Sequence, residues 1–142
     1  MTANPIPPGY HTVTPYLIVS DAGAVIDFAT NAFGAEVRMK HLDRSGRVSH
    51  AEITIGDSVV MIGEGNEQYP PLPSTLHLYL ADVDAVYSRA LAAGGESVRE
   101  PRTEFYGDRM AGVSDSQGNT WWIATRVENL TPEEMQKRAA QQ

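Results

Sequence analysis

Apolar residues alternate with polar ones in two short runs of the chain, and a helical pattern follows each run. The runs are Thr14–Val19 and Thr75–Leu80, where a period of two predicts β-strands. Asp21 and Asp82 come next, and aspartate at that place caps the start of a helix. Alanine-rich stretches then end at glycine, as expected past a helix C-terminus. Each run therefore predicts a strand followed by a helix, the first over about residues 22–33.

These two strand–helix stretches are copies of each other. A shift of 61 residues aligns nine identical pairs between residues 14–37 and 75–98. Unrelated segments of that length would share roughly one or two identities at ordinary residue frequencies. An internal repeat of this kind determines the architecture. The pairs are Thr14/Thr75, Leu17/Leu78, Asp21/Asp82, Ala24/Ala85, Val25/Val86, Ala29/Ala90, Ala32/Ala93, Gly34/Gly95 and Val37/Val98.

The repeat continues into further strands at a shift of 62 residues. The turn Gly56-Asp57-Ser58 then aligns with Gly118-Asn119-Thr120, and each turn leads into a last apolar strand. The sequence therefore predicts an α+β fold of two tandem β-α-β-β-β modules, which form a curved mixed sheet around a cleft.

Proline and capping patterns set the expected boundaries. Thr131-Pro132-Glu133-Glu134 carries an N-cap threonine, a proline at the first helical position and a capping-box glutamate, which together predict a C-terminal helix. In chain order, the expected segments are an extended arm (1–10), module one (12–64), a proline-rich linker (65–73), module two (74–127) and a helical appendage (128–142), with residues 11–127 forming one domain.

Alternation within the strands predicts which sheet face meets the helices. On that side we expect Leu17, Leu78, Met61, Trp121 and Ile123. Aromatic side chains that carry a polar group are typical of a ligand-binding cleft, and a solvated sheet face is the alternative. The opposite parity, expected to line the cleft, carries Tyr16, Val60, Ile62, Glu64, His77, Tyr79, Trp122 and Arg126.

Charge and cysteine content restrict the kinds of molecule that this protein is expected to bind and the chemistry it can perform. The net charge is −7 and the sequence pI is about 4.9, which argues against nucleic acid or an anionic membrane as a partner. The chain has no cysteine, so thiolate chemistry and disulfides are excluded. We find neither a signal-peptide pattern nor a membrane-spanning run, and a cytoplasmic protein is the expectation.

Several motifs make the chain resemble the vicinal oxygen chelate superfamily, the glyoxalase/bleomycin-resistance/extradiol-dioxygenase fold, and its small single-domain bacterial branch. The resemblance covers about residues 10–127 and implies the fold more specifically than the function, because this superfamily hosts lyases, isomerases, dioxygenases and drug-binding proteins. The motifs are the doubled module, Val19-Ser20-Asp21-Ala22, Asn31-Ala32-Phe33-Gly34-Ala35-Glu36, Asp82-Val83-Asp84-Ala85-Val86, Phe105-Tyr106-Gly107-Asp108-Arg109 and Asp115-Ser116-Gln117-Gly118-Asn119-Thr120-Trp121.

The resemblance implies where a divalent metal would be held in a metalloenzyme of this superfamily. The four ligand positions fall on Thr14, Val60, Thr75 and Trp122. Hydroxyl, aliphatic and indole side chains are poor ligands, so no metal is expected there and no cofactor is expected at all. A relocated divalent metal remains the alternative, with His50-Ala51-Glu52 as one weak chelating pair.

Two hypotheses for function follow. The first is a metal-free protein that binds or sequesters a small hydrophobic or planar aromatic molecule, as bleomycin-resistance-type relatives do, and that forms a homodimer. The second is a small glyoxalase-like lyase or isomerase, or a dioxygenase-like enzyme, that uses a relocated metal or His77 with Glu64 as acid–base groups. The residues expected to bind the ligand are Tyr16, Val60, Ile62, His77, Tyr79, Trp122, Arg109 and Arg126.

Overall fold

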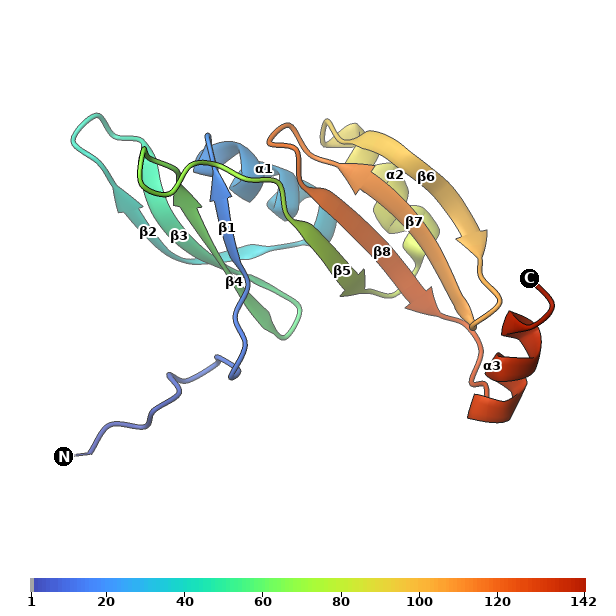
Figure 1. Ribbon diagram of the computed structural model, residues 1–142. Coiled ribbons are helices and arrows are strands. Elements are labelled where there is room, and N and C mark those ends of the chain that lie inside the picture. The colour runs from blue at the N-terminus through green and yellow to red at the C-terminus, as the bar shows by residue number, and fades with distance from the viewer. Residues whose placement is uncertain (1) are drawn as a thin grey trace.

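The computed structural model describes residues 2–142 (Figure 1). Met1, the first residue of the expected arm, lies outside the described residues. The elements are β1 (Tyr16–Val19), α1 (Ala22–Phe33), β2 (Glu36–Leu42), β3 (Val48–Ile55), β4 (Ser58–Glu64), β5 (Thr75–Tyr79), α2 (Val83–Ala92), β6 (Glu96–Thr103), β7 (Asp108–Ser114), β8 (Thr120–Arg126) and α3 (Pro132–Ala139).

The strands form two four-stranded mixed sheets with the same topology. Their orders are β1-β4-β3-β2 and β5-β8-β7-β6. In each sheet the first strand pairs in parallel with the last, and the other neighbours are antiparallel. This confirms the α+β fold of two tandem β-α-β-β-β modules. In residues 2–142 no ladder joins β1 to β5, so the strands do not form one continuous sheet.

Local chemistry explains where the first helix begins and ends. The Asp21 carboxylate accepts a hydrogen bond from the Ala24 amide at 3.1 Å, which caps α1 as expected. Gly34 has a φ of 70°, a left-handed conformation that glycine adopts without strain, and its amide bonds back to the helix. α1 therefore spans Ala22–Phe33, in agreement with the sequence pattern.

The two modules share one hydrophobic core. Figure 1 shows α1 and α2 on one side of both sheets, and the two helices pack against each other. Phe33 of module one lies 5.1 Å from Trp121 of module two between ring centroids, and Phe28 lies 6.3 Å from the same indole. Trp121 is fully buried. Module one therefore completes the core around β8, because Phe28 and Phe33 of α1 pack against Trp121.

Strand register shows which residues of the two modules are equivalent. Leu17 lies opposite Ile62 in the β1–β4 ladder, as Leu78 lies opposite Ile123 in the β5–β8 ladder. Leu17 and Leu78 are 61 positions apart (78 − 17), and so are Ile62 and Ile123 (123 − 62). The last strands are therefore related by a shift of 61 residues, whereas their turn residues align at 62.

This register corrects the faces expected for β4. Ile62 is fully buried and Val60 is 3 % exposed, and both belong to the core beneath the helices. Met61 lies on the opposite side, which we call the outer face, and is the equivalent of Trp122. The prediction that Val60 and Ile62 lie on the face away from the helices while Met61 faces the helices is therefore wrong. A slip of one residue exchanges the two faces of a strand.

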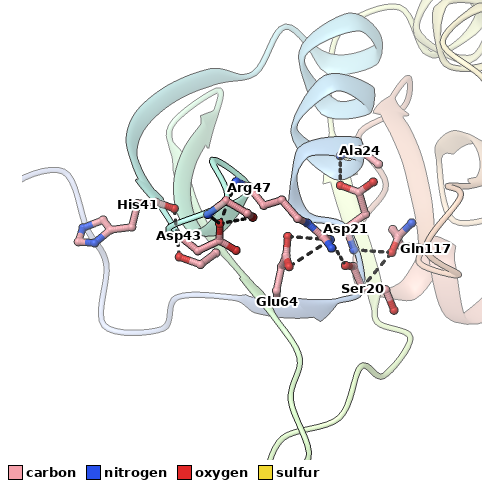
Figure 2. A network of polar contacts seen from close by, with 10 residues as sticks. Ser20, Asp21, Ala24, His41, Asp43, Arg47, Glu64 and Gln117 are labelled. Atoms are coloured by element: carbon pink, nitrogen blue, oxygen red, sulfur yellow. Dashed lines mark hydrogen bonds and ion pairs between the residues drawn. The ribbon is translucent and has the colours of Figure 1, made fainter.

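A buried turn in module two explains the motif between β7 and β8. The Asp115 carboxylate accepts hydrogen bonds from the Asn119 amide and side chain at 3.0 Å and from the Trp121 indole at 2.9 Å. Gln117 at the tip of this turn accepts from the backbone amides of Ser20 and Asp21, at 3.1 and 2.9 Å (Figure 2). The turn thus fastens module two to the start of α1.

Both ends of the chain lie on the periphery. The arm is largely exposed and leads away from module one (Figure 1), with Arg38 stacked 4.9 Å from the Tyr10 ring centroid. Thr131 caps α3 as predicted, and Arg138 binds Glu128 through two 2.9 Å contacts. In residues 2–142 no helix has both the length and the apolar character that a bilayer crossing requires.

Candidate functional site

A crevice of about 500 Å³ lies where the β3–β4 turn of module one approaches strand β5 of module two. We call it the inter-module crevice. It brings together three of the predicted ligand-binding residues, Val60, His77 and Tyr79. Its mixture of aliphatic and polar side chains suits a small organic molecule. The complete lining is Pro15, Ile55, Gly56, Asp57, Ser58, Val60, Thr75, Leu76, His77, Leu78, Tyr79 and Leu80.

His77 and Tyr79 form the polar edge of this crevice. Their rings lie 5.0 Å apart between centroids, on exposed positions of β5. The Tyr79 hydroxyl donates a 2.8 Å hydrogen bond to Asp108, which is only 4 % exposed. That hydrogen bond, with some burial, raises the pKa of Tyr79 above its ordinary value. Tyr79 therefore stays a neutral donor with its hydroxyl fixed.

Glu64 does not stand beside His77. Its carboxylate lies 3.2 Å from the Arg47 guanidinium, which also donates to the Ser20 carbonyl (Figure 2). Glu64 borders a different cavity, of about 290 Å³, beneath residues 65–73; we call it the linker cavity. Over residues 2–142 no hydrogen bond or ion pair joins Glu64 to His77. The two residues therefore do not form the paired acid–base groups of the enzyme hypothesis.

Neither predicted arginine lines the inter-module crevice. Arg109 binds both oxygens of Asp84 at 2.8 and 3.0 Å, and this pairing lowers the pKa of the Asp84 carboxyl. Arg126 donates to the Asn129 side chain at 3.0 Å. Arg109 thus pairs with α2, whereas Arg126 bonds to the connection that follows β8.

Trp122 is half-buried on the outer face of module two, whereas Trp121 beside it is in the core. The Trp122 ring lies across Gly112, where a Cβ would stand 2.7 Å from a ring carbon. The guanidinium carbon of Arg99 lies 5.2 Å from the ring centroid, within cation–π range. The indole therefore packs against Gly112 and carries the Arg99 guanidinium over its ring, and it does not line the inter-module crevice.

The positions that hold a metal in related metalloenzymes do not suit one here. With the corrected register they are Thr14, Met61, Thr75 and Trp122. A thioether and two hydroxyls do not form a ligand set for a hard divalent cation, and indole is no ligand. Within residues 2–142 we find no cluster of three or more His, Asp or Glu side chains arranged to hold a metal.

The sequence pattern missed one polar cluster on the outer face of module one. The Tyr16 hydroxyl lies 3.2 Å from His50 Nδ1, and His50 Nε2 lies 3.6 Å from a Glu52 oxygen. The shared parity of His50 and Glu52 indicated a common face. Contact with Tyr16 depends on the pairing of β3 with β4 and of β4 with β1, which local sequence does not reveal.

The fold and the doubled module define the class of protein, and a family model agrees. The model of the Glyoxalase/Bleomycin resistance protein/Dioxygenase superfamily matches residues 10–123. The chain belongs to this superfamily, as its motifs predicted.

Individual relatives share the fold over most of the chain. The uncharacterized protein Mb0911c of Mycobacterium bovis is 31 % identical over 141 residues, which cover 92 % of this chain and 93 % of the relative. Among solved structures, TioX from Micromonospora sp. ML1 superposes with a TM-score of 0.72 at 22 % identity, covering 82 % of this chain and 99 % of TioX. TnmS3, an antibiotic binding protein from Streptomyces sp. CB03234, superposes with a TM-score of 0.66 at 24 % identity, covering 82 % and 95 %.

Proposed function

We propose that this protein binds and sequesters a small hydrophobic or planar aromatic molecule without a metal. One observation carries the proposal: Met61 and Trp122 occupy the outer-face positions that the superfamily resemblance implies for metal ligands, and they offer apolar and aromatic contact instead. The structural likeness to TnmS3, described as an antibiotic binding protein, supports the same class of function.

The inter-module crevice and the Trp122 face supply the binding energy in this proposal. Apolar burial contributes about 25 cal/mol per Å² and an aromatic pair about 0.5–1.5 kcal/mol more. Leu76 and Leu78 are only partly buried against the core where they border the crevice, so a ligand there would remove them from water. His77 and Tyr79 would orient the ligand's polar atoms.

Tryptophan fluorescence tests this proposal. We expect planar aromatic compounds to change the emission saturably, and we expect Trp122→Ala to weaken binding at least about tenfold through lost stacking and burial. Trp121 supplies a constant background because it is fully buried. His77→Ala should weaken binding less, by one hydrogen bond of about 0.5–1.5 kcal/mol. Leu91→Ala, on the exposed side of α2, is the matched control and should leave affinity unchanged.

Metal content separates this proposal from the enzyme alternative. We expect a chelator to leave the fluorescence titration unchanged. The proposal is falsified if a stoichiometric divalent metal co-purifies and its removal abolishes ligand binding.

We also propose that the protein is a homodimer whose contact includes the arm or α3. The arm exposes Ile6, and Val13 beyond it is also exposed. α3 buries none of its residues, and β5 is an edge strand of its sheet. Sedimentation should show a dimer at a protein concentration on the order of tens of micromolar. The concentration matters because the fraction of dimer follows mass action. Removing residues 2–10 or 131–142 should weaken it, and a monomeric full chain would contradict the proposal.

A further inference from the structure

Three polar side chains form a connected chain on the outer face of module one. Tyr16 lies on β1 and contacts His50 on β3 at 3.2 Å, and Glu52 on the same strand lies 3.6 Å from the other ring nitrogen of His50. The Glu52 carboxylate favours the proton of the imidazole on Nε2. In the neutral imidazole that carries its proton on Nε2, Nδ1 accepts the hydrogen bond that the Tyr16 hydroxyl donates.

Gly63 makes this contact possible. It lies on β4 between Ile18 of β1 and His50 of β3, and a Cβ there would stand 2.5 Å from the Tyr16 hydroxyl oxygen. The tyrosine ring therefore crosses β4 through the space that a side chain at position 63 would fill. Glycine in the interior of a strand commonly marks such a close approach.

The cluster lies between two cavities. Tyr16 and Gly63 border the linker cavity. Glu52 borders a cavity of about 530 Å³ formed with the N-terminal arm, Thr14 and Met61. Tyr16 is 51 % exposed, whereas the His50 and Glu52 side chains are 27 % and 14 % exposed. A ligand on this face therefore meets Tyr16 first, because the imidazole and carboxylate are less exposed.

A hydroxyl that donates to His50 keeps its own oxygen free to accept a hydrogen bond. We infer that Tyr16, His50 and Glu52 form a subsite for an acidic hydroxyl group, of the phenol or enol class, on a planar ligand. The ligand hydroxyl donates to Tyr16, Tyr16 donates to His50, and Glu52 holds the imidazole in the accepting form. Linked donors polarise one another, which favours an acidic donor over a neutral ether. This inference rests on the proposed class of ligand and adds a second subsite, separate from the inter-module crevice, with the chemical group that is recognised there.

Equilibrium dialysis at about pH 7 with 4-cyanophenol, which stays largely protonated there, and its methyl ether, 4-cyanoanisole, tests the subsite. The two probes share a planar ring, and only the phenol can donate a hydrogen bond. The full chain should bind the phenol about fivefold more tightly than the ether, the value of one net hydrogen bond. Tyr16→Phe should abolish this difference and leave the affinity for the ether unchanged. Tyr87→Phe is the control. It removes a hydroxyl on α2 that bonds to Ser97 on β6, and it should leave the preference for the phenol unchanged.

Gly63→Ala provides a second variant that leaves every polar group in place. Its added Cβ should displace the Tyr16 ring and remove the phenol preference with Tyr16, His50 and Glu52 all present. Equal binding of the two probes to the unaltered chain overturns the subsite but leaves the proposed function intact. Equal weakening of both probes by Tyr16→Phe also overturns the subsite. If neither probe binds, both the subsite and the binding of small planar molecules on this face are wrong.

Discussion

The two modules have the same strand order and the same pairing, yet their outer faces differ. In module one, the Tyr16 ring of β1 lies over Gly63 and contacts His50. In module two, the Trp122 ring of β8 lies over Gly112 and contacts Arg99. Both modules therefore place an aromatic ring over a glycine. The ring comes from the first strand in module one and from the last strand in module two, and its partner is a histidine in one and an arginine in the other.

The helix-side residues of the modules differ far less. Leu17 and Leu78 are equivalent, as are Ile62 and Ile123, and each pair consists of identical residues on the same face. Tyr16 and His77 are also equivalent by register, and they share only an outward position. Packing restricts the size and shape of a buried residue, whereas an outer position can change without loss of the fold. The duplicated scaffold therefore presents two chemically different surfaces.

The largest expected effect contrasts the adjacent tryptophans of β8. Trp121→Ala should lower the free energy of unfolding by about 3–5 kcal/mol, because it removes a fully buried ring packed against Phe28 and Phe33. Trp122→Ala should lower it by only about 1–2 kcal/mol, since that ring stacks on Arg99 at the surface. Urea denaturation of both variants gives the comparison. Equal losses would show that the two faces of β8 are not distinct.

A second contrast concerns equivalent leucines. Leu17→Ala should cost about 2–5 kcal/mol, as expected for a side chain that is 2 % exposed. Leu78→Ala should cost less, about 1–2 kcal/mol, because Leu78 is only partly buried and borders the inter-module crevice. Thermal and urea unfolding measure both. If Leu78→Ala lowers the free energy of unfolding as much as Leu17→Ala, then Leu78 is fully buried and the crevice is closed in solution.

The hydrogen bond of Tyr79 to the buried Asp108 carboxylate has no counterpart in module one, where Ile18 is equivalent to Tyr79. Tyr79→Phe leaves the buried Asp108 carboxylate without this donor and should cost about 1–3 kcal/mol. The pKa of Tyr79 is raised in the folded chain, so the hydrogen bond stabilises fully below the unfolded tyrosine pKa, about 10, and is lost as pH rises through the folded value.

Stability measured from pH 8 upward should therefore fall more steeply in the unaltered chain than in Tyr79→Phe. Tyr87→Phe is the control, since its hydroxyl bonds to Ser97 and not to a carboxylate. Parallel pH profiles for the unaltered chain and Tyr79→Phe would contradict the assignment.

The smallest effect concerns α3, which only module two carries. The Arg138 hydrogen bonds lower the pKa of Glu128, so this pair stabilises docking above the unfolded glutamate pKa and ceases to do so as pH falls through the folded value. Amide hydrogen exchange in α3 should accelerate at acid pH and, in Glu128→Gln, already at neutral pH. Glu67→Gln, on the linker, should change neither. Unaltered exchange in Glu128→Gln would mean that other contacts dock the helix.

The sequence by itself determined the elements and their duplication. Caps such as Asp21 and Thr131 act through hydrogen bonds to residues three positions away, and strand alternation depends on neighbouring residues only. The repeat then implied that the two modules share one fold, because similar sequences fold into similar modules. The separate faces of Trp121 and Trp122 also followed from parity alone, and the structure confirms that Trp121 is buried whereas Trp122 is half-buried on the other face.

Only the tertiary structure decided the faces of β4 and the partners of the polar residues. The β7–β8 connection is one residue longer than the β3–β4 connection between equivalent ladder positions, so matching the glycine turns displaced Val60, Met61 and Ile62 by one residue. Glu64 was expected near His77, but its carboxylate pairs with Arg47. Tyr16 meets His50 across Gly63 through strands far apart in sequence. Such contacts depend on ladder register between distant segments, and no local pattern encodes that register.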